Sequence, residues 1–348
     1  MSDVWRLSNA ADAVAPPDWA QPFVEADAAW RAGRAEGVSS GSTGAPKRFS
    51  FDPKAVVAST RASAEHFGLS HPDGQPVHVW SALPATGIGG RMMVWRTRIL
   101  GWALTQDRPS SAPTVSPAPD GHRYDFAVTT PQQAAHLARS GQLTAFQLLL
   151  LGGAPVSPAL ETKLLEAGRA QNCALHVGFG MTETLTHIAT RPLGRDVFLP
   201  LPGVTWSCGQ DGALRLDVPD RGVDSLLTRD AVEPRRDAQS GRDGFVWLGR
   251  LDDVINTGGL KVHPDRLERT LEPIVAPLIG ARRWYLTGRP DPLTGMRVTL
   301  VIEGEGEPTL TARLLDALET GHPHADRPRA VEWQTKLEET ATGKVRRR

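Results

Sequence analysis

Residues 124–153 read YDFAVTTPQQAAHLARSGQLTAFQLLLLGG, and this stretch carries the clearest structural signal in the chain. Tyr124–Val128 predicts a short strand, and Pro131–Arg139 predicts a helix with proline in its first turn. Phe146–Leu151 is an almost continuous apolar run that ends at the pair Gly152-Gly153, which is typical of a buried strand. A strand, a helix and a second strand in this order indicate an α/β fold with a largely parallel sheet.

Further elements are predicted on both sides of this unit. Val56–Phe67 predicts a helix, and Val77–Leu83 alternates well enough to predict a strand that ends at a proline. Residues 1–36 are rich in alanine with scattered tryptophan, which predicts helices with weak caps. Residues 197–250 change to short strands separated by turns, so we expect a small antiparallel β subdomain there.

The last segment of the chain predicts a separate small α+β domain. At about 100–200 residues per domain, a chain of 348 residues suits one large and one small domain. We therefore expect a large domain over residues 1–251 and a small one over residues 252–348. The elements predicted in the small domain are helices near 264–275 and 308–319 and strands near 282–288 and 296–303.

The composition indicates a globular chain without a broad polyanion-binding surface. The residues are 40% hydrophobic and 22% charged, which is enough apolar material for a sizeable core. Lys plus Arg equals Asp plus Glu at 39 each, so the net charge is zero. A nucleic-acid-binding module is disfavoured, because such modules carry basic patches.

Cysteine usage and hydropathy favour the cytoplasm. Cys173 and Cys208 form neither a disulfide framework nor a metal-ligand spacing. The N-terminal residues lack the basic and apolar regions of a signal peptide. The longest apolar stretch, Phe146–Leu151, is far too short to span a bilayer. We expect a cytoplasmic protein with no stable membrane insertion.

The segment Ser39–Lys47 (SSGSTGAPK) is the first candidate for phosphate binding. Glycines allow backbone N–H groups to converge on an anion, the hydroxyls add donors, and Lys47 adds a positive charge. The spacing is not that of a Walker A loop. A flexible linker is the alternative interpretation.

The segment Gly178–Thr184 (GFGMTET) is the second candidate. Phe179 stands between two glycines and is suited to lie flat against a planar base. Glu183 is a hard oxygen ligand for Mg²⁺, and Thr182 can donate to a phosphate or carboxylate oxygen. The alternative is a helix N-terminus capped by Thr182 or Thr184.

Two later segments combine charge with glycine. Leu248–Val262 (LGRLDDVINTGGLKV) contains Gly258-Gly259, which would allow a ligand to approach the backbone closely. Thr340–Arg348 (TATGKVRRR) places Lys344 in a basic run. An interdomain turn with a surface ion pair and a solvated tail are the respective alternatives.

Taken in order, these four segments resemble the signature segments of the adenylate-forming superfamily. That superfamily includes acyl-CoA synthetases, peptide-synthetase adenylation domains and luciferases. The resemblance covers residues 39–348, about nine-tenths of the chain, although the usual N-terminal portion of the family is much longer. It implies a large α/β domain with a small antiparallel β subdomain, followed by a small mobile α+β domain.

Further stretches resemble the short o-succinylbenzoate–CoA ligases of menaquinone biosynthesis. These stretches are Ala82–Arg96, Leu151–Val156, Met181–Ala189, Leu227–Glu233 and Trp247–Gly259. The resemblance implies a ligase that uses ATP, Mg²⁺ and coenzyme A. A carboxylate would attack the α-phosphate of ATP to give an acyl-adenylate and pyrophosphate, and the CoA thiol would then displace AMP. The implied partners are small molecules, and the sequence leaves a homodimer open.

The resemblance also implies an ATP site. Ser39–Lys47 would bind the β- and γ-phosphates, and Gly153–Pro155 and Phe179 would enclose the adenine. Asp230 and Arg250 would hold the ribose. The implied ATP- and AMP-binding residues are Ser39, Ser40, Gly41, Ser42, Thr43, Gly44, Lys47, Gly153, Ala154, Pro155, Phe179, Gly180, Met181, Asp230 and Arg250.

Lys344, Thr182 and Glu183 are the implied catalytic residues. Lys344 would bridge the substrate carboxylate and the α-phosphate, where a fixed positive charge stabilises the crowded negative charge of the transition state. Thr182 would contact the α-phosphate, and Glu183 would hold the metal.

The implied site is completed by the small domain. Asp252 matches the hinge about which that domain would rotate between the two half-reactions. Gly258, Gly259 and Lys261 would then face the site for the CoA step.

The implied acyl pocket includes Gly87, Arg91, Thr184 and His187. The second carboxylate of an aromatic dicarboxylate needs a buried partner. Arg91 is our first candidate for that partner and His187 the second. A structural ion pair for Arg91 and a packing role for His187 are the alternatives.

The chain departs from the family pattern at several positions. Gly87 replaces the usual aromatic residue or histidine, Phe179 replaces tyrosine, and Arg229 replaces the glycine before Asp230. Other functions therefore stay open. They are another acyl- or aryl-CoA ligase, an adenylation enzyme that loads a carrier protein, and a nucleotide-binding protein without ligase activity.

Overall fold

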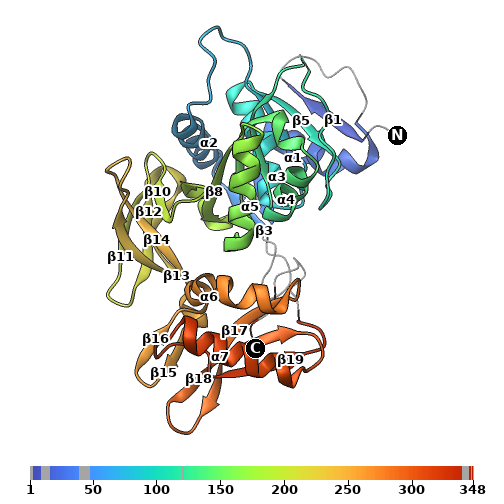
Figure 1. Cartoon of the computed structure of the whole chain (residues 1–348). Helices are drawn as coiled ribbons and strands as arrows, with labels where there is room; N and C mark the ends of the chain where they lie inside the picture. The colour runs from blue at the N-terminus through green and yellow to red at the C-terminus, as the bar shows by residue number, and fades with distance from the viewer. Residues whose placement is uncertain are drawn as a thin grey trace.

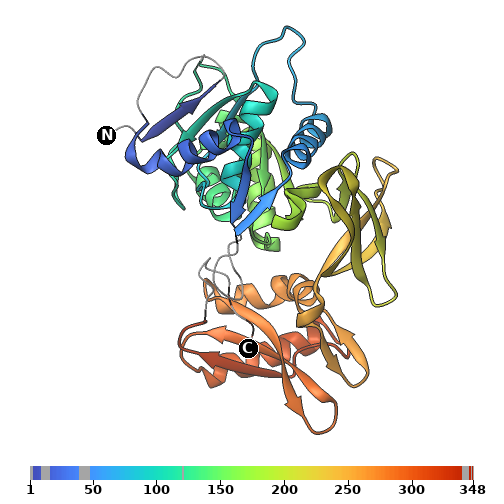
Figure 2. The same cartoon turned by 180° about the vertical axis from the view of Figure 1, so that it is seen from behind.

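The computed structural model describes residues 3–8, 16–38, 48–119, 121–338, 345 and 347. It has three lobes, which Figures 1 and 2 show from opposite sides. An N-terminal lobe of strands and helices runs to residue 192, a β lobe spans residues 197–250, and a C-terminal lobe begins at residue 251. The N-terminal and C-terminal lobes lie at opposite ends of the molecule, and the β lobe lies beside them.

A twelve-stranded sheet runs through the first two lobes in the order β1-β5-β4-β6-β7-β8-β9-β10-β14-β13-β12-β11. Neighbouring parallel strands form its centre, which confirms the predicted α/β class. These strands are β5 (Ala103–Asp107), β4 (His78–Ser81), β6 (Tyr124–Thr129), β7 (Phe146–Leu151) and β8 (Ala174–Met181).

Helices join these parallel strands. They are α3 (Ile88–Leu100), α4 (Pro131–Arg139) and α5 (Pro158–Ala170), and the 3₁₀ turn η2 (Gln142–Ala145) precedes β7. Thr130 and Gln133 form a capping box at the start of α4, so this helix begins and ends where the sequence predicts. The chain passes from β5 back across β4 to β6, and such a reversal marks the sheet edge at which α/β proteins bind ligands.

The two faces of the sheet belong to two hydrophobic cores. Val79 and Leu150 pack on the face covered by α1 (Gln21–Arg31), α2 (Pro53–Phe67) and α3. Their chain neighbours Trp80 and Leu149 pack on the opposite face with α4 and α5. Alternate residues of a strand point to opposite faces, so the near-continuous apolar run of β7 fills both cores.

The β lobe continues the same sheet with antiparallel strands. They are β10 (Val197–Pro200), β14 (Asp243–Arg250), β13 (Val223–Arg236), β12 (Ala213–Val218) and β11 (Thr205–Cys208), and β9 (Thr186–Pro192) at the end of the N-terminal lobe lies between them and β8. The antiparallel pattern predicted over residues 197–250 is therefore present. These strands are joined to the parallel sheet through β9, so they do not form a sheet of their own.

The C-terminal lobe has its own sheet in the order β16-β15-β18-β17, with β19 parallel to β18. Leu271 and Val275 of one helix and Leu314 and Leu318 of the other pack in its core. Its elements are η5 (Leu251–Asp253), β15 (Ile255–Thr257), β16 (Leu260–Val262), α6 (Pro264–Ile279), β17 (Trp284–Asp291), β18 (Gly295–Glu303), α7 (Pro308–Gly321) and β19 (Ala330–Gln334).

The N-terminal residues correct one prediction. Residues 1–36 were expected to be helical, yet only η1 (Asp18–Ala20) and α1 are helical among the described ones. β1 (Val4–Leu7) pairs antiparallel with β5, and β2 (Ala35–Val38) pairs with β3 (Arg48–Phe51). Trp5 and Leu7 are both buried in the β1 strand, so long-range pairing overrides the local helical composition.

Among the described residues, no helix combines the length and apolar character needed to cross a membrane.

Candidate active site

Three loops lie at the carboxyl edge of the parallel strands. Residues 82–87 follow β4, residues 152–157 follow β7, and the 3₁₀ turn η3 (Thr182–Thr184) follows β8. Because these strands are parallel, their carboxyl ends share one edge of the sheet. The second signature segment and the predicted adenine and acyl segments therefore come together there.

The predicted adenine loop is open to solvent. Gly153 has φ +82°, a backbone conformation that favours glycine, and Ala154 and Pro155 are exposed. Ser157 caps α5 by accepting a hydrogen bond from the Leu160 N–H at 3.3 Å. The loop is thus held at both ends, by β7 and by a capped helix.

Phe179 lies half-buried on β8. Its ring centroid is 5.6 Å from that of Phe198 and 5.3 Å from that of Phe245, with an edge contact to the latter. Gly180 follows at a β-bulge, where an added Cβ would lie 2.0 Å from the Thr186 carbonyl oxygen. The second glycine of Gly-Phe-Gly is therefore required by the close approach of β9.

The η3 turn holds the predicted metal ligand. Thr184 is fully buried, and its Oγ1 accepts from the Met181 N–H at 3.1 Å and donates to the Thr186 carbonyl at 2.9 Å. Thr184 is the last residue of η3 and bonds back to the N-cap residue Met181, so it is not the helix N-cap that the alternative interpretation expected. Glu183 is exposed at the end of β8, and the half-buried Thr182 begins the turn.

The acyl segment begins at the N-terminus of α3. Gly87 is the N-cap residue, and Gly90 packs so tightly that an added Cβ would lie 2.5 Å from the Pro84 carbonyl oxygen. Arg91 donates from Nη1 to the Glu36 carbonyl at 3.3 Å. The structure therefore ties this predicted carboxylate partner to the backbone of β2.

His187 is buried and neutral. Its Nε2 lies 3.1 Å from the Ser63 hydroxyl on α2, and the residue is 7% exposed. Burial, with the nearby charges of Arg96 and Arg221, holds the pKa of His187 well below its ordinary value. A neutral imidazole can donate a hydrogen bond to a carboxylate but cannot neutralise its charge.

Two buried arginines flank the turn between η3 and β9. Arg96, on α3, donates from Nη2 to Thr186 Oγ1 at 3.3 Å. Arg221, at the end of η4 (Pro219–Arg221), donates from Nη1 to the carbonyls of Thr184 and His187, each at 3.2 Å.

These two guanidiniums lack a counter-charge in the described part of the chain. They are 2% and 6% exposed, and neither has a carboxylate within ion-pair distance there. The Arg96 Nε and Arg221 Nη2 are buried and make no hydrogen bond to described residues. Burial lowers the pKa of each side chain to about 10, and at Arg96 the charge of Arg221 adds to this. Buried cations are normally paired, so this cluster is suited to an anion.

Asp230 and Arg250, the predicted ribose contacts, are register partners on β13 and β14. The Trp247 indole N–H donates to Asp230 Oδ1 at 2.9 Å, and Arg250 Nη1 lies 3.9 Å from Oδ2. Burial raises the pKa of Asp230. Arg250 also donates to Asp252 at 3.3 Å, which links the predicted ribose contact to the predicted hinge.

Asp252 has a second arginine partner. Arg229, which stands where the family pattern has glycine, donates to Asp252 Oδ1 at 2.5 Å. The hydrogen bond from Arg229 is the main cause that lowers the pKa of Asp252. The pair is exposed on both sides, so it is an interaction of modest strength.

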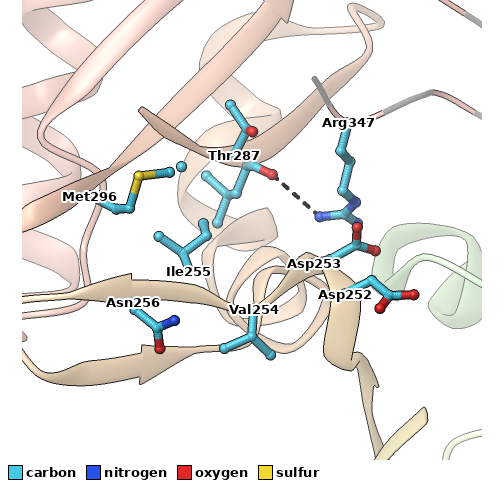
Figure 3. A pocket seen from close by; sticks show the side chains of 10 residues that line it. Asp252, Asp253, Val254, Ile255, Asn256, Thr287, Met296 and Arg347 are labelled. Atoms are coloured by element: carbon cyan, nitrogen blue, oxygen red, sulfur yellow. Dashed lines mark hydrogen bonds between the residues drawn. The ribbon is translucent and has the colours of Figure 1, made fainter. Parts of the chain in front are cut away.

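A cavity of about 310 Å³ lies next to this position (Figure 3). Asp252, Asp253 and Arg347 line it, and the Arg347 guanidinium lies beside the Asp253 carboxylate. Arg347 also donates to Glu268 at 2.6 and 2.9 Å and to Asp265 at 2.8 Å. Burial raises the pKa of Glu268 to about 7, although the Arg347 charge opposes this rise. Arg347 therefore anchors the chain end to α6.

The predicted CoA contacts lie on the C-terminal lobe. Gly258 and Gly259 form the tip of the β15–β16 hairpin with φ of +54° and +84°, and Lys261 on β16 is exposed. The predicted phosphate-binding segment Ser39–Lys47 lies outside the described residues, and so does the predicted catalytic residue Lys344.

Arg96 and Arg221 are not among the site residues that the sequence predicts. A signal for Arg96 exists, because it follows the apolar run Met92–Trp95 in a predicted acyl segment. No local pattern marks Arg221, which reaches the turn because η4 packs against α2 and β13.

The exposed carboxylate of Glu183 is chemically suited to the Mg²⁺ ion that the sequence predicts. Among the described residues, no group of three or more His, Cys, Asp or Glu side chains could hold a metal ion. A single exposed carboxylate such as Glu183 suits Mg²⁺, which is commonly bound by one or two carboxylates together with substrate phosphates.

Residues 38–210 match the family model described as AMP-binding enzyme. A 2-succinylbenzoate–CoA ligase of Enterococcus faecalis is 23% identical over 342 residues, covering 88% of this chain and 67% of that protein. A 4-coumarate–CoA ligase of Rhodobacter capsulatus is 27% identical over 311 residues, covering 88% and 73%.

A solved structure matches nearly the whole chain. It is the acyl-CoA synthetase (AMP-forming)/AMP-acid ligase II-like protein from Dyadobacter fermentans, which is 26% identical with a TM-score of 0.61. The match covers 98% of this chain and 97% of that one. The fold is therefore shared over nearly the whole length of a similar protein.

Proposed function

Because this chain belongs to the AMP-binding enzyme family, the adenylate-forming enzymes, we propose that it is an ATP-dependent acyl-CoA synthetase. The observation that supports this best is the carboxyl edge of the sheet. There the adenine loop, Phe179 and Glu183 come together, and Asp230 supplies a buried carboxylate on the neighbouring lobe. The substrates are a small carboxylic acid, ATP and CoA.

In the first half-reaction a carboxylate oxygen attacks the α-phosphate and pyrophosphate leaves. Asp230 accepts hydrogen bonds from the ribose hydroxyls, and the Trp247 indole N–H fixes the orientation of that carboxylate. Thr182 donates to an α-phosphate oxygen. Bound Mg²⁺ would be held by Glu183 and would neutralise phosphate charge. Lys344 stabilises the charge that builds up between carboxylate and phosphate.

In the second half-reaction the CoA thiolate attacks the acyl carbonyl carbon, and AMP leaves. We assign the large domain to residues 1–251 and the small domain to residues 252–348, with rotation at Asp252. This rotation would carry Gly258, Gly259 and Lys261 toward the adenylate. In the present structure Arg229 and Arg250 hold the Asp252 carboxylate.

The acyl substrate we propose is o-succinylbenzoate, which would place the enzyme in menaquinone biosynthesis. The 2-succinylbenzoate–CoA ligase relative supports this assignment, as does the cluster of Arg96 and Arg221. Two buried cations that meet no carboxylate among the described residues are costly unless an anion binds them, and the second carboxylate of this acid is such an anion. Arg96 is therefore a better candidate for its partner than the neutral His187.

Another acyl- or aryl-CoA ligase is the alternative. The 4-coumarate–CoA ligase relative is as similar as the 2-succinylbenzoate one, and its named substrate is also an aromatic acid. An enzyme that loads a carrier protein differs from both only in the thiol that accepts the acyl group in the second half-reaction.

A pyrophosphate-release assay with a panel of acids tests this proposal. The acids are o-succinylbenzoate, benzoate, phenylacetate and a medium-chain fatty acid, each with Mg·ATP, and Lys344→Ala is the control. We expect release with o-succinylbenzoate that is lost in the control. Release only with another acid would support the synthetase activity but reject o-succinylbenzoate as the substrate. No release with any acid would contradict the proposed function.

A further inference from the structure

We propose that Arg221 is a positioning residue that holds the turn formed by residues 184–187 and thereby places Thr186 against Arg96. The substrate consequence rests on the proposed function, because that function makes Arg96 a contact of the acyl substrate. The claim that Arg221 holds the turn does not rest on that function, because it concerns only the conformation of the backbone.

The turn has an unfavourable backbone conformation. Leu185 has φ +55° and Thr186 has φ +77°, so two consecutive residues other than glycine lie in the left-handed region. A β-branched residue such as threonine is rarely found there. Strain of this kind persists only where surrounding contacts impose it, and it gathers at functional sites.

Arg221 bridges the strained pair. Its Nη1 donates to the carbonyl of Thr184, before the pair, and to the carbonyl of His187, after it, at 3.2 Å each. The side chain is 6% exposed, so water does not compete for these bonds. Both carbonyls can face one nitrogen only while the residues between them keep their turned conformation.

Other contacts depend on the same turn. The Leu185 carbonyl accepts from Ser59 Oγ on α2 at 3.0 Å, and the Thr186 hydroxyl accepts from Arg96 at 3.3 Å. If the turn relaxes, the Thr186 hydroxyl leaves Arg96, because its direction is set by the local φ. Arg221 therefore acts on the acyl site through Thr186 and Arg96.

Arg221→Met tests this role, and Arg123→Met is the matched control. Arg123 is also partly buried and donates to two backbone carbonyls, those of Phe146 and Asn172, but it lies at the opposite edge of the sheet. We expect Arg221→Met to raise KM for the diacid about tenfold and KM for ATP less than twofold. Arg123→Met should lower stability without this split. An equal rise of both KM values in Arg221→Met would overturn the role.

A double-mutant cycle measured by thermal unfolding tests the role of Arg221 in the turn and needs no activity assay. Thr186→Gly removes the strain. In the parent, release of that strain partly offsets the loss of the Arg221 bonds, so Arg221→Met should lower Tm more in the Thr186→Gly background than in the parent. Equal losses in both backgrounds would refute the proposal even if the synthetase assignment is correct. Conversely, a protein that is inactive with every acid but shows this coupling would contradict only the proposed function. If Arg221→Met does not fold, Arg221→Lys provides the same cycle with a partial donor.

Discussion

At the scale of single residues, the site is defined by charges that burial leaves without partners. Arg96 and Arg221 are buried next to the turn that follows η3, and neither meets a carboxylate in the described part of the chain. Such an arrangement lowers the stability of the empty protein and strengthens binding of an anion. This is the physical basis on which we favour a second carboxylate in the substrate.

Replacing Arg96 should weaken binding of the diacid more than binding of an acid with a single carboxylate. Arg96→Met keeps an unbranched apolar side chain and removes the charged guanidinium. We expect at least a tenfold rise in KM for o-succinylbenzoate, no comparable rise for benzoate, and unchanged or increased stability, because an unpaired buried charge is removed. Steady-state pyrophosphate release with each acid measures this. The same loss with benzoate would show that Arg96 does not recognise the second carboxylate.

Asp230 gives the corresponding prediction for the nucleotide. Asp230→Ala removes the carboxylate that the Trp247 indole orients, and we expect KM for ATP to rise by tenfold or more with little change for the acid. Trp247→Phe should cause a smaller rise, because it removes the orienting donor but keeps the carboxylate. A larger effect of Asp230→Ala on the acid than on ATP would contradict the ribose assignment.

At the scale of elements, the carboxyl end of β8 depends on close contact with β9. Gly180 has no room for a side chain, because a Cβ would lie 2.0 Å from the Thr186 carbonyl oxygen. Gly152, at the end of β7, has open space around it. The two glycines have similar places in the sequence pattern but different structural constraints.

Gly180→Ala should therefore lower the free energy of unfolding by about 2 kcal/mol or more, since the backbone of β9 must shift. Gly152→Ala should change it by less than about 0.5 kcal/mol. Chemical denaturation of both variants measures the difference. Equal effects would mean that the β-bulge at Gly180 adapts freely.

The sequence predicts correctly those helices and strands whose ends are marked by nearby residues. The helix Pro131–Arg139 and the strand Phe146–Leu151 have the predicted bounds, because a proline in the first turn and a glycine pair mark them in the sequence. β1 was missed, since its strand form depends on pairing with β5, about 100 residues away. The position of Arg221 has the same cause: its partners are carbonyls brought close by the fold.

At the scale of the whole molecule, buried histidines link stability to pH. Burial lowers the pKa of His66 and His187, and lowers that of His176 to about 4 from an ordinary value of 6.5. Between pH 6.5 and about 4 the unfolded chain binds protons that the native state does not bind, so stability falls as the pH falls. Above pH 6.5 this contribution is fully present.

His176→Phe should reduce that loss by up to about 3 kcal/mol between pH 7 and pH 4. The parent and variant must be compared by denaturation at each pH, because Glu268, whose pKa is raised to about 7, titrates in the same range with the opposite sign. Parallel stability curves for the two proteins would contradict the assignment to His176.

The end of the chain is tied to the C-terminal lobe by ionic contacts. Arg347→Met would leave Glu268 and Asp265 without their main counter-charge, so we expect a loss of about 3 kcal/mol. Arg327→Met removes a more exposed pair with Glu319 and should cost less than about 1 kcal/mol. Similar losses in both variants would show that burial adds nothing to the Arg347 contacts.

The central claim is that this chain joins a carboxylic acid to CoA at the expense of ATP. Mass spectrometry of one incubation with o-succinylbenzoate, Mg·ATP and CoA tests it most directly. We predict a product with the mass of the o-succinylbenzoyl-CoA thioester, formed together with AMP and absent without ATP. Adenylate without any thioester would contradict CoA as the acceptor, and neither product would contradict the claim as a whole.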